Sequence, residues 1–249
     1  HTSHTKKMEK YILITGGTKG IGRAVADILA QSGYKLILTY GSDEVQAAKV
    51  KAEFQELYPA SEEVLQADIS EKQGIDTIEN YLNTREIHLF SVVFNAGLTC
   101  RTPFEQMTLE EWERVFFANV HFPVFMLQRI CSTLQPGGNV LFTGSLMGEY
   151  AHSVSLAYGV SKSAVHALVK NLVKFMQPYK IRVNAVAPGF VDTDWQKTKP
   201  AEIRKSIESK IALGRFCSPD EVAEVYKMII ENNYFNGEVI PISGGYSYK

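Results

Sequence analysis

Tyr158 and Lys162 are the two side chains whose types and spacing first suggest chemistry. Residues four apart in a helix lie on one face, so a phenol and an ammonium group at these positions would be neighbours. A phenol has an ordinary pKa of about 10, and moving it near neutrality takes about 4 kcal/mol of preferential stabilisation of the tyrosinate. A close positive charge contributes to that stabilisation, and a phenol tuned in this way acts as a general acid or base near pH 7. The spacing alone is weak evidence, because chance produces such a pair in a chain rich in Tyr and Lys.

A glycine-rich loop, Gly16–Gly22, follows the expected strand Tyr11–Thr15 and leads directly into a helix. Backbone N–H groups and the positive end of a helix at such a place favour a phosphate group. We expect Gly16 to take the tight turn, Gly20 to let the backbone approach a ligand and Gly22 to let helix and strand pack closely. The spacing differs from the G-x-G-x-x-G fingerprint and from a Walker loop, so a purely structural glycine-rich turn is the alternative.

A buried parallel sheet is the element that would bring these residues together. From Met8 onward, short apolar runs alternate with longer segments of helical periodicity, and no linker-like stretch divides them. The runs are apolar on both faces, which is typical of a parallel sheet covered by helices on each side. We therefore expect one doubly wound, Rossmann-like α/β domain over residues 8–249, with a mostly parallel sheet and helices on both faces. Such a sheet binds ligands at the carboxyl ends of its strands.

The sequence also predicts where the individual elements lie. The expected strands are Tyr11–Thr15, Lys35–Tyr40, Val64–Ala67, Leu89–Phe94, Asn139–Thr143, Arg182–Ala187 and Val239–Ile242. The expected helices are Gly22–Gln31, one that opens at Ser42 or Asp43, Ile75–Asn83, Leu109–Leu134, Val154–Met176, Pro200–Lys210 and Asp220–Asn232. Asp43 with Gln46, and Thr108 with Glu111, match the capping box, in which two residues satisfy each other's backbone amides at a helix start.

Composition and charge exclude several classes of protein. The 249 residues carry a formal net charge of −1, so the chain lacks the basic surface that nucleic acids or anionic lipids require. The three cysteines are far apart without metal-ligand spacing, which favours free thiols in a reducing compartment, the cytoplasm, and no metal site. No apolar run is long enough to span a membrane. Residues 1–7 precede Met8 and are expected to form an added or frayed tail outside the fold.

Further motifs join the glycine loop and the Tyr/Lys pair in a fixed order. The ordered set comprises Gly16–Gly22, Asn95-Ala96-Gly97, Asn119, Ser145, Tyr158, Lys162 and Pro188-Gly189. Each motif is weak singly, but together they make the chain resemble the short-chain dehydrogenase/reductase family from Met8 to Tyr246. Within the family, the resemblance is strongest to the 3-oxoacyl-acyl-carrier-protein reductase-like members. Two segments depart from them: Lys174–Arg182 is short and lacks the usual acidic residue, and Cys131–Gly138 lacks a basic cluster suited to an acidic carrier protein.

The resemblance implies roles for four catalytic residues. Tyr158 would exchange a proton with the substrate oxygen while a hydride moves between the substrate carbon and the nicotinamide. Lys162 would lower the Tyr158 pKa and hold the nicotinamide ribose, and Ser145 would hydrogen-bond the substrate oxygen. Asn119 would interrupt the hydrogen bonding of its helix and hold a water that relays protons to Lys162. Taken singly, Ser145 is also compatible with a loop cap, and Asn119 with an amide on a helix surface.

The same resemblance implies that a dinucleotide lies along the carboxyl edge of the sheet. Asp68 would contact the adenine with Ile69 beside the ring, and the alternative for Asp68 is an N-cap of the next helix. Val191 and Thr193 would bind the carboxamide and the phosphates. The full set of expected cofactor contacts is Gly16, Thr18, Lys19, Gly20, Ile21, Gly22, Tyr40, Asp68, Ile69, Asn95, Ala96, Gly97, Tyr158, Lys162, Pro188, Gly189, Val191 and Thr193.

The end of the second strand favours NADP(H) over NAD(H). Family members that prefer NAD carry an acidic residue there to bind the ribose 2′-hydroxyl, and Tyr40 or Gly41 occupies this place. A carboxylate would repel a 2′-phosphate, whereas Lys19 in the glycine loop would attract one. Asp43 argues against this assignment, and helix capping explains it better.

These features predict an NADP(H)-dependent carbonyl reductase that acts on a small-molecule ketone or the corresponding secondary alcohol, with 3-oxoacyl thioesters as one candidate class. The alternative is a catalytically silent dinucleotide-binding sensor, although such proteins typically lose the Tyr or the Lys. His152 is either a substrate contact or a surface-loop residue, and Trp195 either covers the ligand or packs its loop. The family also implies a homotetramer or homodimer.

Overall fold

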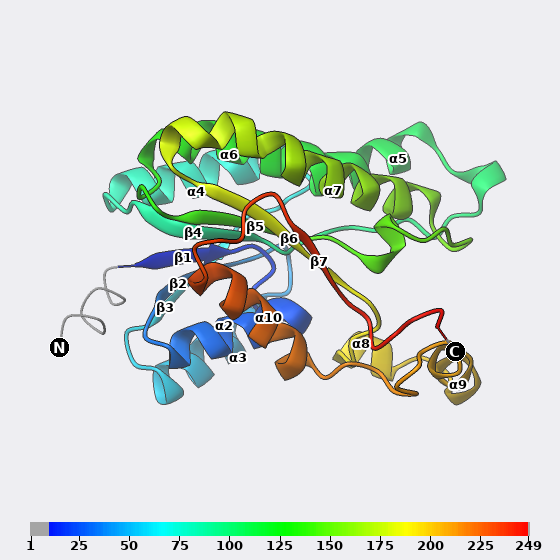
Figure 1. Ribbon diagram of the computed structural model, residues 1–249. Helices are drawn as coiled ribbons and strands as arrows, with labels where there is room; N and C mark the ends of the chain where they lie inside the picture. The colour runs from blue at the N-terminus through cyan, green and yellow to red at the C-terminus, as the bar shows by residue number, and fades with distance from the viewer. Residues whose placement is uncertain (1–9, 249) are drawn as a thin grey trace.

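Seven parallel strands form the central layer of the molecule (Figure 1). The computed structural model describes residues 10–248, so the tail expected over residues 1–7 lies outside them. The strands are β1 (Tyr11–Ile14), β2 (Lys35–Tyr40), β3 (Glu62–Gln66), β4 (Leu89–Phe94), β5 (Asn139–Thr143), β6 (Arg182–Pro188) and β7 (Val239–Ile242). Their order is β3-β2-β1-β4-β5-β6-β7, and each neighbouring pair is parallel. The order reverses between β1 and β4, which is the switch point where such sheets bind ligands.

Helices cover both faces of the sheet, which confirms the expected fold class (Figure 1). One face carries α2 (Gly20–Gln31), α3 (Glu44–Leu57) and α10 (Pro219–Glu231). The other carries α4 (Lys72–Thr84), α5 (Leu109–Phe116), α6 (Phe122–Ile130) and α7 (Leu156–Met176). Two short helices, α8 (Asp194–Lys197) and α9 (Ala201–Glu208), follow β6 and lie near the C-terminal end of the chain. Among residues 10–248, none of the helices has the length and apolar character needed to cross a membrane.

The core consists of two apolar layers, one on each side of the sheet. Ile12 and Leu36 pack into the layer under α2 and α10, whereas Leu13 and Ile37, one residue further along, pack into the opposite layer. Successive side chains of a strand point to opposite faces, so a strand buried on both sides must be apolar at consecutive positions. This is why the strands of this chain show continuous apolar runs.

A turn of π-helix divides the long helix that the sequence predicts over Leu109–Leu134. The Thr108/Glu111 capping box forms as expected, but α5 ends at Phe116 and the π turn occupies Phe117–His121 before α6 begins. Pro123 gives a physical reason. It has no amide hydrogen, so the carbonyl of Asn119 four residues earlier has no ordinary α-helical donor. The expectation of one continuous helix is therefore wrong, and the interruption implied at Asn119 is present.

The start of α3 also differs in part from its expected capping box. The Asp43 side chain accepts the Gln46 amide at 3.1 Å, as the sequence predicts. The Gln46 side chain does not return to Asp43 but donates to the Thr18 carbonyl at 3.0 Å. This bond joins the beginning of α3 to the glycine loop, so the Gln46 side chain holds two parts of the expected nucleotide site together.

Candidate active site

Two cavities open beside the carboxyl edge of the sheet, each with a volume of about 650 Å³. One is lined by the β1–α2 loop, including Lys19 and Gly20, together with Thr193. The other is lined by Ser145 and Tyr158. Trp195 on α8 lines both. The residues expected to bind a dinucleotide and those expected to bind a substrate thus border adjoining spaces.

Tyr158 stands in the first turn of α7 and faces the second cavity. Ser155 caps this helix by accepting the Tyr158 backbone N–H at 3.2 Å, which fixes where α7 begins. Burial raises the pKa of Tyr158, and a hydrogen bond with the Ser145 side chain opposes the rise. The Ser145 hydroxyl also accepts the Met147 amide at 3.0 Å, so Ser145 both caps its turn and contacts Tyr158.

Lys162 lies one turn further along α7 and is only 4% exposed. Its ammonium group donates to the Thr143 carbonyl at 2.8 Å and lies 5.6 Å from the centre of the Tyr158 ring. Burial lowers the pKa of Lys162 to about 8. The expected lowering of the Tyr158 pKa by Lys162 is not present in this structure: the pKa of Tyr158 lies above its usual value, because burial outweighs the opposing hydrogen bond with the Ser145 side chain.

Asn119 is buried and tied to two segments of the chain. Its side-chain oxygen accepts the Leu98 amide at 2.8 Å, and its side-chain nitrogen donates to the Leu98 carbonyl at 2.9 Å. The same nitrogen donates to the Ser161 hydroxyl at 3.0 Å, which in turn donates to the Tyr158 carbonyl at 2.9 Å. An amide on a helix surface is therefore the wrong interpretation. Asn119 instead links the π turn to Ser161 on α7 and to Leu98 in the loop after β4.

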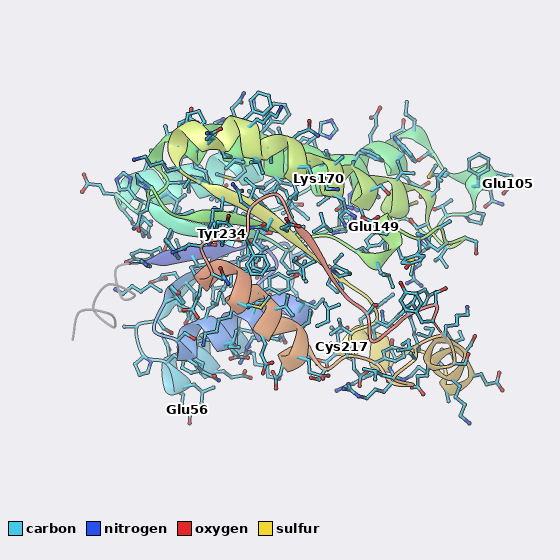
Figure 2. The ribbon with its side chains drawn as sticks, viewed as in Figure 1. Glu56, Glu105, Glu149, Lys170, Cys217 and Tyr234 are labelled. Atoms are coloured by element: carbon cyan, nitrogen blue, oxygen red, sulfur yellow. The ribbon has the colours of Figure 1, made fainter. Side chains whose placement is uncertain are left out.

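His166 is a residue of the site that the sequence reasoning missed. It lies on α7 four residues beyond Lys162 and is 5% exposed. Its Nε2 accepts the Ser145 backbone N–H at 3.2 Å, and its Nδ1 lies 2.7 Å from the Glu149 carboxylate. Since Nε2 accepts, the proton of a neutral ring sits on Nδ1 and is donated to Glu149. Glu149 lies beside α7 in Figure 2, on the loop that also carries Ser145.

The Tyr158-x-x-x-Lys162-x-x-x-His166 spacing was a usable signal for His166, because the three residues share one helix face.

The sequence analysis also missed a hydrogen-bonded group of side chains at Thr143, whose carbonyl accepts from Lys162. Thr143 donates to the Asn95 side-chain oxygen at 3.0 Å and therefore accepts, at 2.5 Å, from the hydroxyl of the fully buried Tyr226. Nothing in the sequence marks Tyr226, since it comes from α10 on the opposite side of the sheet.

The glycine loop has the geometry that a close phosphate requires. Gly16 has φ +64°, in the left-handed region, and a Cβ on Gly22 would lie 2.2 Å from the Gly16 carbonyl oxygen. A side chain at either position would strain or displace the loop. Asn95 supports it by donating to the Gly16 carbonyl at 3.3 Å, while Thr15 accepts the amides of Asn95 and Ala96. The first turn of α2 has no side-chain cap, so its amides remain for a ligand.

The expected nicotinamide end of the site is bounded by Gly97 and by the segment after β6. A Cβ on Gly97 would lie 3.1 Å from Asn119 Oδ1 and 3.4 Å from Lys162 Nζ, so glycine keeps this approach open. Pro188 ends β6, the Gly189 amide donates to the Ile242 carbonyl at 2.8 Å, and the buried Val191 forms a β-bridge with Cys217. Thr193 starts α8, and its methyl group would be 3.5 Å from a Cβ on Gly20.

At the adenosine end, Tyr40 closes β2 and no atom lies within 4 Å of a Cβ built on Gly41. Burial would raise the pKa of Asp68, but hydrogen bonds from the Ser70 hydroxyl and amide outweigh it and lower this pKa. The N-cap of α4 is Glu71, so the capping alternative for Asp68 is wrong. Ile69 is half-buried beside it.

Lys19, which lines the first cavity, forms an ion pair of 2.5 Å with Asp43. Asp43 therefore does more than cap α3. Its carboxylate neutralises Lys19, the cation that is expected to bind a 2′-phosphate. The pKa of Asp43 is lowered mainly by its hydrogen bond with Lys19.

The set of residues at this edge fits a nicotinamide dinucleotide. It combines a strained glycine turn, uncapped helix amides, a glycine beside a buried lysine, and an open space after β2. Among residues 10–248 there is no cluster of three His, Cys, Asp or Glu side chains that would hold a metal ion.

Comparison with known proteins identifies the family. A family model described as enoyl-(acyl carrier protein) reductase matches residues 16–247. The 3-oxoacyl-[acyl-carrier-protein] reductase FabG of Aquifex aeolicus (strain VF5) is 32% identical over 96% of this chain and 98% of its own. The uncharacterized oxidoreductase YmfI of Bacillus subtilis (strain 168) is also 32% identical, over 96% of this chain and 99% of its own.

A solved short-chain dehydrogenase of Burkholderia cenocepacia J2315, in complex with NADP, has a TM-score of 0.88 at 27% identity and covers 95% of this chain and 97% of its own. The chain belongs to the short-chain dehydrogenase/reductase family of oxidoreductases. Its similarity to 3-oxoacyl-acyl-carrier-protein reductases agrees with the resemblance drawn from the motifs.

Proposed function

We propose that the protein is an NADP(H)-dependent carbonyl reductase that converts a ketone to a secondary alcohol, or catalyses the reverse oxidation. The observation that carries this proposal is the meeting of Tyr158, Ser145 and the buried Lys162 beside one cavity. The same sheet serves as nucleotide-binding and catalytic unit, since the glycine loop lies at the adjoining cavity. The NADP-bound Burkholderia relative supports the choice of cofactor.

In the reduction, Tyr158 and Ser145 bind the substrate oxygen, and Tyr158 donates a proton to it. The pKa of Tyr158 lies above its usual value, so the phenol carries its proton at pH 7. Lys162 stabilises the tyrosinate that remains. One of its three hydrogens is donated to the Thr143 carbonyl, which leaves two for the nicotinamide ribose hydroxyls. When bound, the nicotinamide nucleotide supplies the hydride.

Asn119 serves the return of the proton. Its side chain is fully engaged with Leu98 and Ser161, so the group available to hold a water is its backbone carbonyl. Pro123 leaves that carbonyl without its ordinary helical donor. A water on this carbonyl would serve as a relay toward Lys162. Gly97, which lies beside both the Asn119 side chain and Lys162 Nζ, places no side chain between them.

For the cofactor we propose the same contacts that the sequence predicts. The glycine loop and the amides of α2 hold the pyrophosphate, Asp68 and Ile69 border the adenine, and Thr193 reaches the phosphates from α8. NADP(H) is favoured because β2 ends in Tyr40 without a carboxylate. The silent-sensor alternative is disfavoured, since both Tyr158 and Lys162 are in place.

Among ketones, a 3-oxoacyl thioester is supported by the FabG relative. We also propose a homotetramer or homodimer in the cytoplasm. Exposed aromatic side chains on α6 and α7, Phe125 (45% exposed) and Phe175 (68% exposed), support self-association. The three free cysteines are compatible with a reducing compartment.

Titration of the purified protein with NADPH and NADH, followed by NADPH oxidation against a panel of small ketones, tests the proposal. We expect tighter binding of NADPH and turnover of at least one ketone. Failure to bind either nucleotide would refute the nucleotide site itself. Binding of NADPH without turnover of acyclic ketones, oxo acids or thioesters would favour the sensor.

A further inference from the structure

The second cavity has an unusual balance of charge. Three of its lining residues are cationic, Arg101, Lys199 and Lys210, and none of its lining residues is Asp or Glu. The adjoining cavity differs, because four Asp residues line it together with its cations. The space that Ser145 and Tyr158 border is therefore positively charged.

Within the described residues, none of the three cations has a carboxylate partner within ion-pair distance. Other cations of the same region are neutralised. Arg204 on α9 lies 3.0 Å from Asp192, and Arg215 lies 2.8 Å from Glu221. Among residues 10–248, Arg204 and Arg215 are thus paired with carboxylates, whereas the three cations that line the cavity are not.

Trp195 brings two of these cations close to each other. The Arg101 guanidinium lies 4.6 Å from the centre of its ring, and the Lys199 ammonium lies 5.1 Å from it. Attraction to the indole partly offsets the repulsion of the two like charges. The repulsion remains evident at Lys199, whose pKa is lowered by burial, by Arg101 and by Arg204. Such a pair gains stability when an anion binds between its members.

Arginine and lysine together suit a carboxylate or a phosphate. The planar guanidinium donates two parallel hydrogen bonds to either group, and the ammonium adds a mobile point charge. Arg101 comes from the loop after β4 and Lys199 from the segment between α8 and α9, so a ligand that binds both residues connects these two segments.

We propose that the substrate is an anionic ketone whose carboxylate or phosphate binds Arg101 and Lys199 while its carbonyl lies at Ser145 and Tyr158. This inference rests on the proposed function and adds the substrate class to it. It differs from an acyl-carrier substrate, whose acyl chain would enter the cavity without a charge. Lys210, two residues after the end of α9, adds positive charge at the same cavity.

The first experiment compares pairs of ketones of which one member is anionic and the other neutral. The probes are 4-oxopentanoate and 5-oxohexanoate with their methyl esters, and hydroxyacetone phosphate with hydroxyacetone. We expect kcat/KM to be about ten- to hundredfold higher for one class of anion than for its neutral partner, since hydrogen bonds to charged groups contribute on this scale. The carboxylate and phosphate pairs show which anion the site prefers.

Variants then assign the preference to the cations. Arg101→Gln and Lys199→Gln should each remove about tenfold of the kcat/KM for the preferred anion and leave the neutral partner unchanged. The matched control is Lys205→Gln, an exposed lysine of α9 that does not line the cavity and should keep the preference. Equal turnover of acids and esters in the wild-type protein would overturn the proposal. The proposal would also be overturned if these variants lost kcat/KM only for a thioester bound to a carrier protein. That result would assign Arg101 and Lys199 to the docking of an acidic protein.

A binding measurement separates this inference from the proposed function. The chain has two Trp, so a Trp112→Phe variant reports Trp195 alone. Titration of this variant with 5-oxohexanoate or hydroxyacetone phosphate should change Trp195 fluorescence, with an affinity that falls as salt is added. This signal tests the anion site even where no turnover occurs. An unchanged fluorescence with both anions up to millimolar concentration would refute the site.

Discussion

At the scale of single residues, burial shifts the pKa values of Tyr158 and Lys162 in opposite directions. It raises the pKa of the phenol and lowers the pKa of the ammonium group to about 8. At pH 7 the phenol is therefore protonated and Lys162 is mostly charged. This is the state in which Tyr158 can give up a proton and a neighbouring cation can stabilise the tyrosinate left behind.

Replacement of the phenol tests this argument most directly. Tyr158→Phe keeps the ring and removes the hydroxyl, so kcat should fall by about 10²- to 10⁴-fold, the range that a positioned general acid contributes. The NADPH Kd from fluorescence titration should stay close to that of the wild type, because the phosphate contacts are elsewhere. Tyr234→Phe is a matched control, since that side chain is 97% exposed. A Tyr158→Phe protein with wild-type turnover would rule out Tyr158 as the proton donor.

At the scale of the elements, the ends of helices carry much of the site. The N-terminus of α2 is left without a side-chain cap beside the glycine loop, whereas α3 is capped by Asp43. The Asp43 carboxylate serves that helix and Lys19 at once. If Lys19 binds the 2′-phosphate as proposed, the Asp43 side chain couples the capping of α3 to the choice of nucleotide.

Asp43→Asn separates the two roles of that carboxylate. Asn caps helices about as well as Asp, so the free energy of unfolding should change by only a few tenths of a kcal/mol. The negative charge beside Lys19 is lost, and the NADPH Kd should fall by about two- to fivefold while the NADH Kd stays constant. Glu44→Gln removes a charge from the same helix start without touching that ion pair and should have no such effect. An equal change for both nucleotides would place Lys19 away from the 2′-phosphate.

The π turn between α5 and α6 is the second element whose irregularity has a proposed use. Pro123→Ala restores an amide that can donate to the Asn119 carbonyl, and so competes with a water there. We expect kcat to fall by about ten- to hundredfold with little change in the NADPH Kd. Pro178→Ala, in a 3-10 turn away from the cavities, is the control. Wild-type kcat in a folded Pro123→Ala protein, as judged by circular dichroism, would remove the carbonyl from the proton path.

At the scale of the whole molecule, local patterns predicted far more of the fold than of the contacts between distant segments. The bounds of β2, β4, β5 and β7 agree with those expected, because each is a short and mostly apolar run. The prediction of one continuous helix over Leu109–Leu134 was wrong. Hydrophobic periodicity is the same with or without the amide hydrogen that Pro123 lacks, so it does not reveal the π turn.

In the candidate site, too, the motif residues could be predicted from the sequence and the contacts between distant segments could not. Ser145, Tyr158 and Lys162 could be found because the family motif fixes their types and intervals. The Lys19–Asp43 pair, the Glu149 partner of His166 and the unpaired cations around Trp195 could not. Each joins segments whose distance depends on how the whole sheet folds.

The His166 pair makes the stability of the molecule depend on pH. Burial lowers the pKa of His166 below its ordinary value of 6.5, although Glu149 opposes the shift and Lys162 and Lys170 add to it. The folded protein therefore favours the neutral ring, whose Nε2 accepts the Ser145 amide. This contribution is fully present above pH 6.5 and is lost as the pH falls through the lowered pKa, because the unfolded chain binds the proton more readily.

We expect the melting temperature of the wild-type protein to fall between pH 7.5 and pH 5, and His166→Gln to remove part of that fall. Glutamine carries an amide oxygen that can accept the Ser145 amide but does not titrate, so the two proteins differ in the protonation step. His88→Gln is a control from an exposed histidine, whose Nδ1 contacts only a backbone carbonyl. Equal pH dependence in wild type and His166→Gln would show that protonation of His166 is not coupled to unfolding, and that the Ser145 loop is held by other contacts.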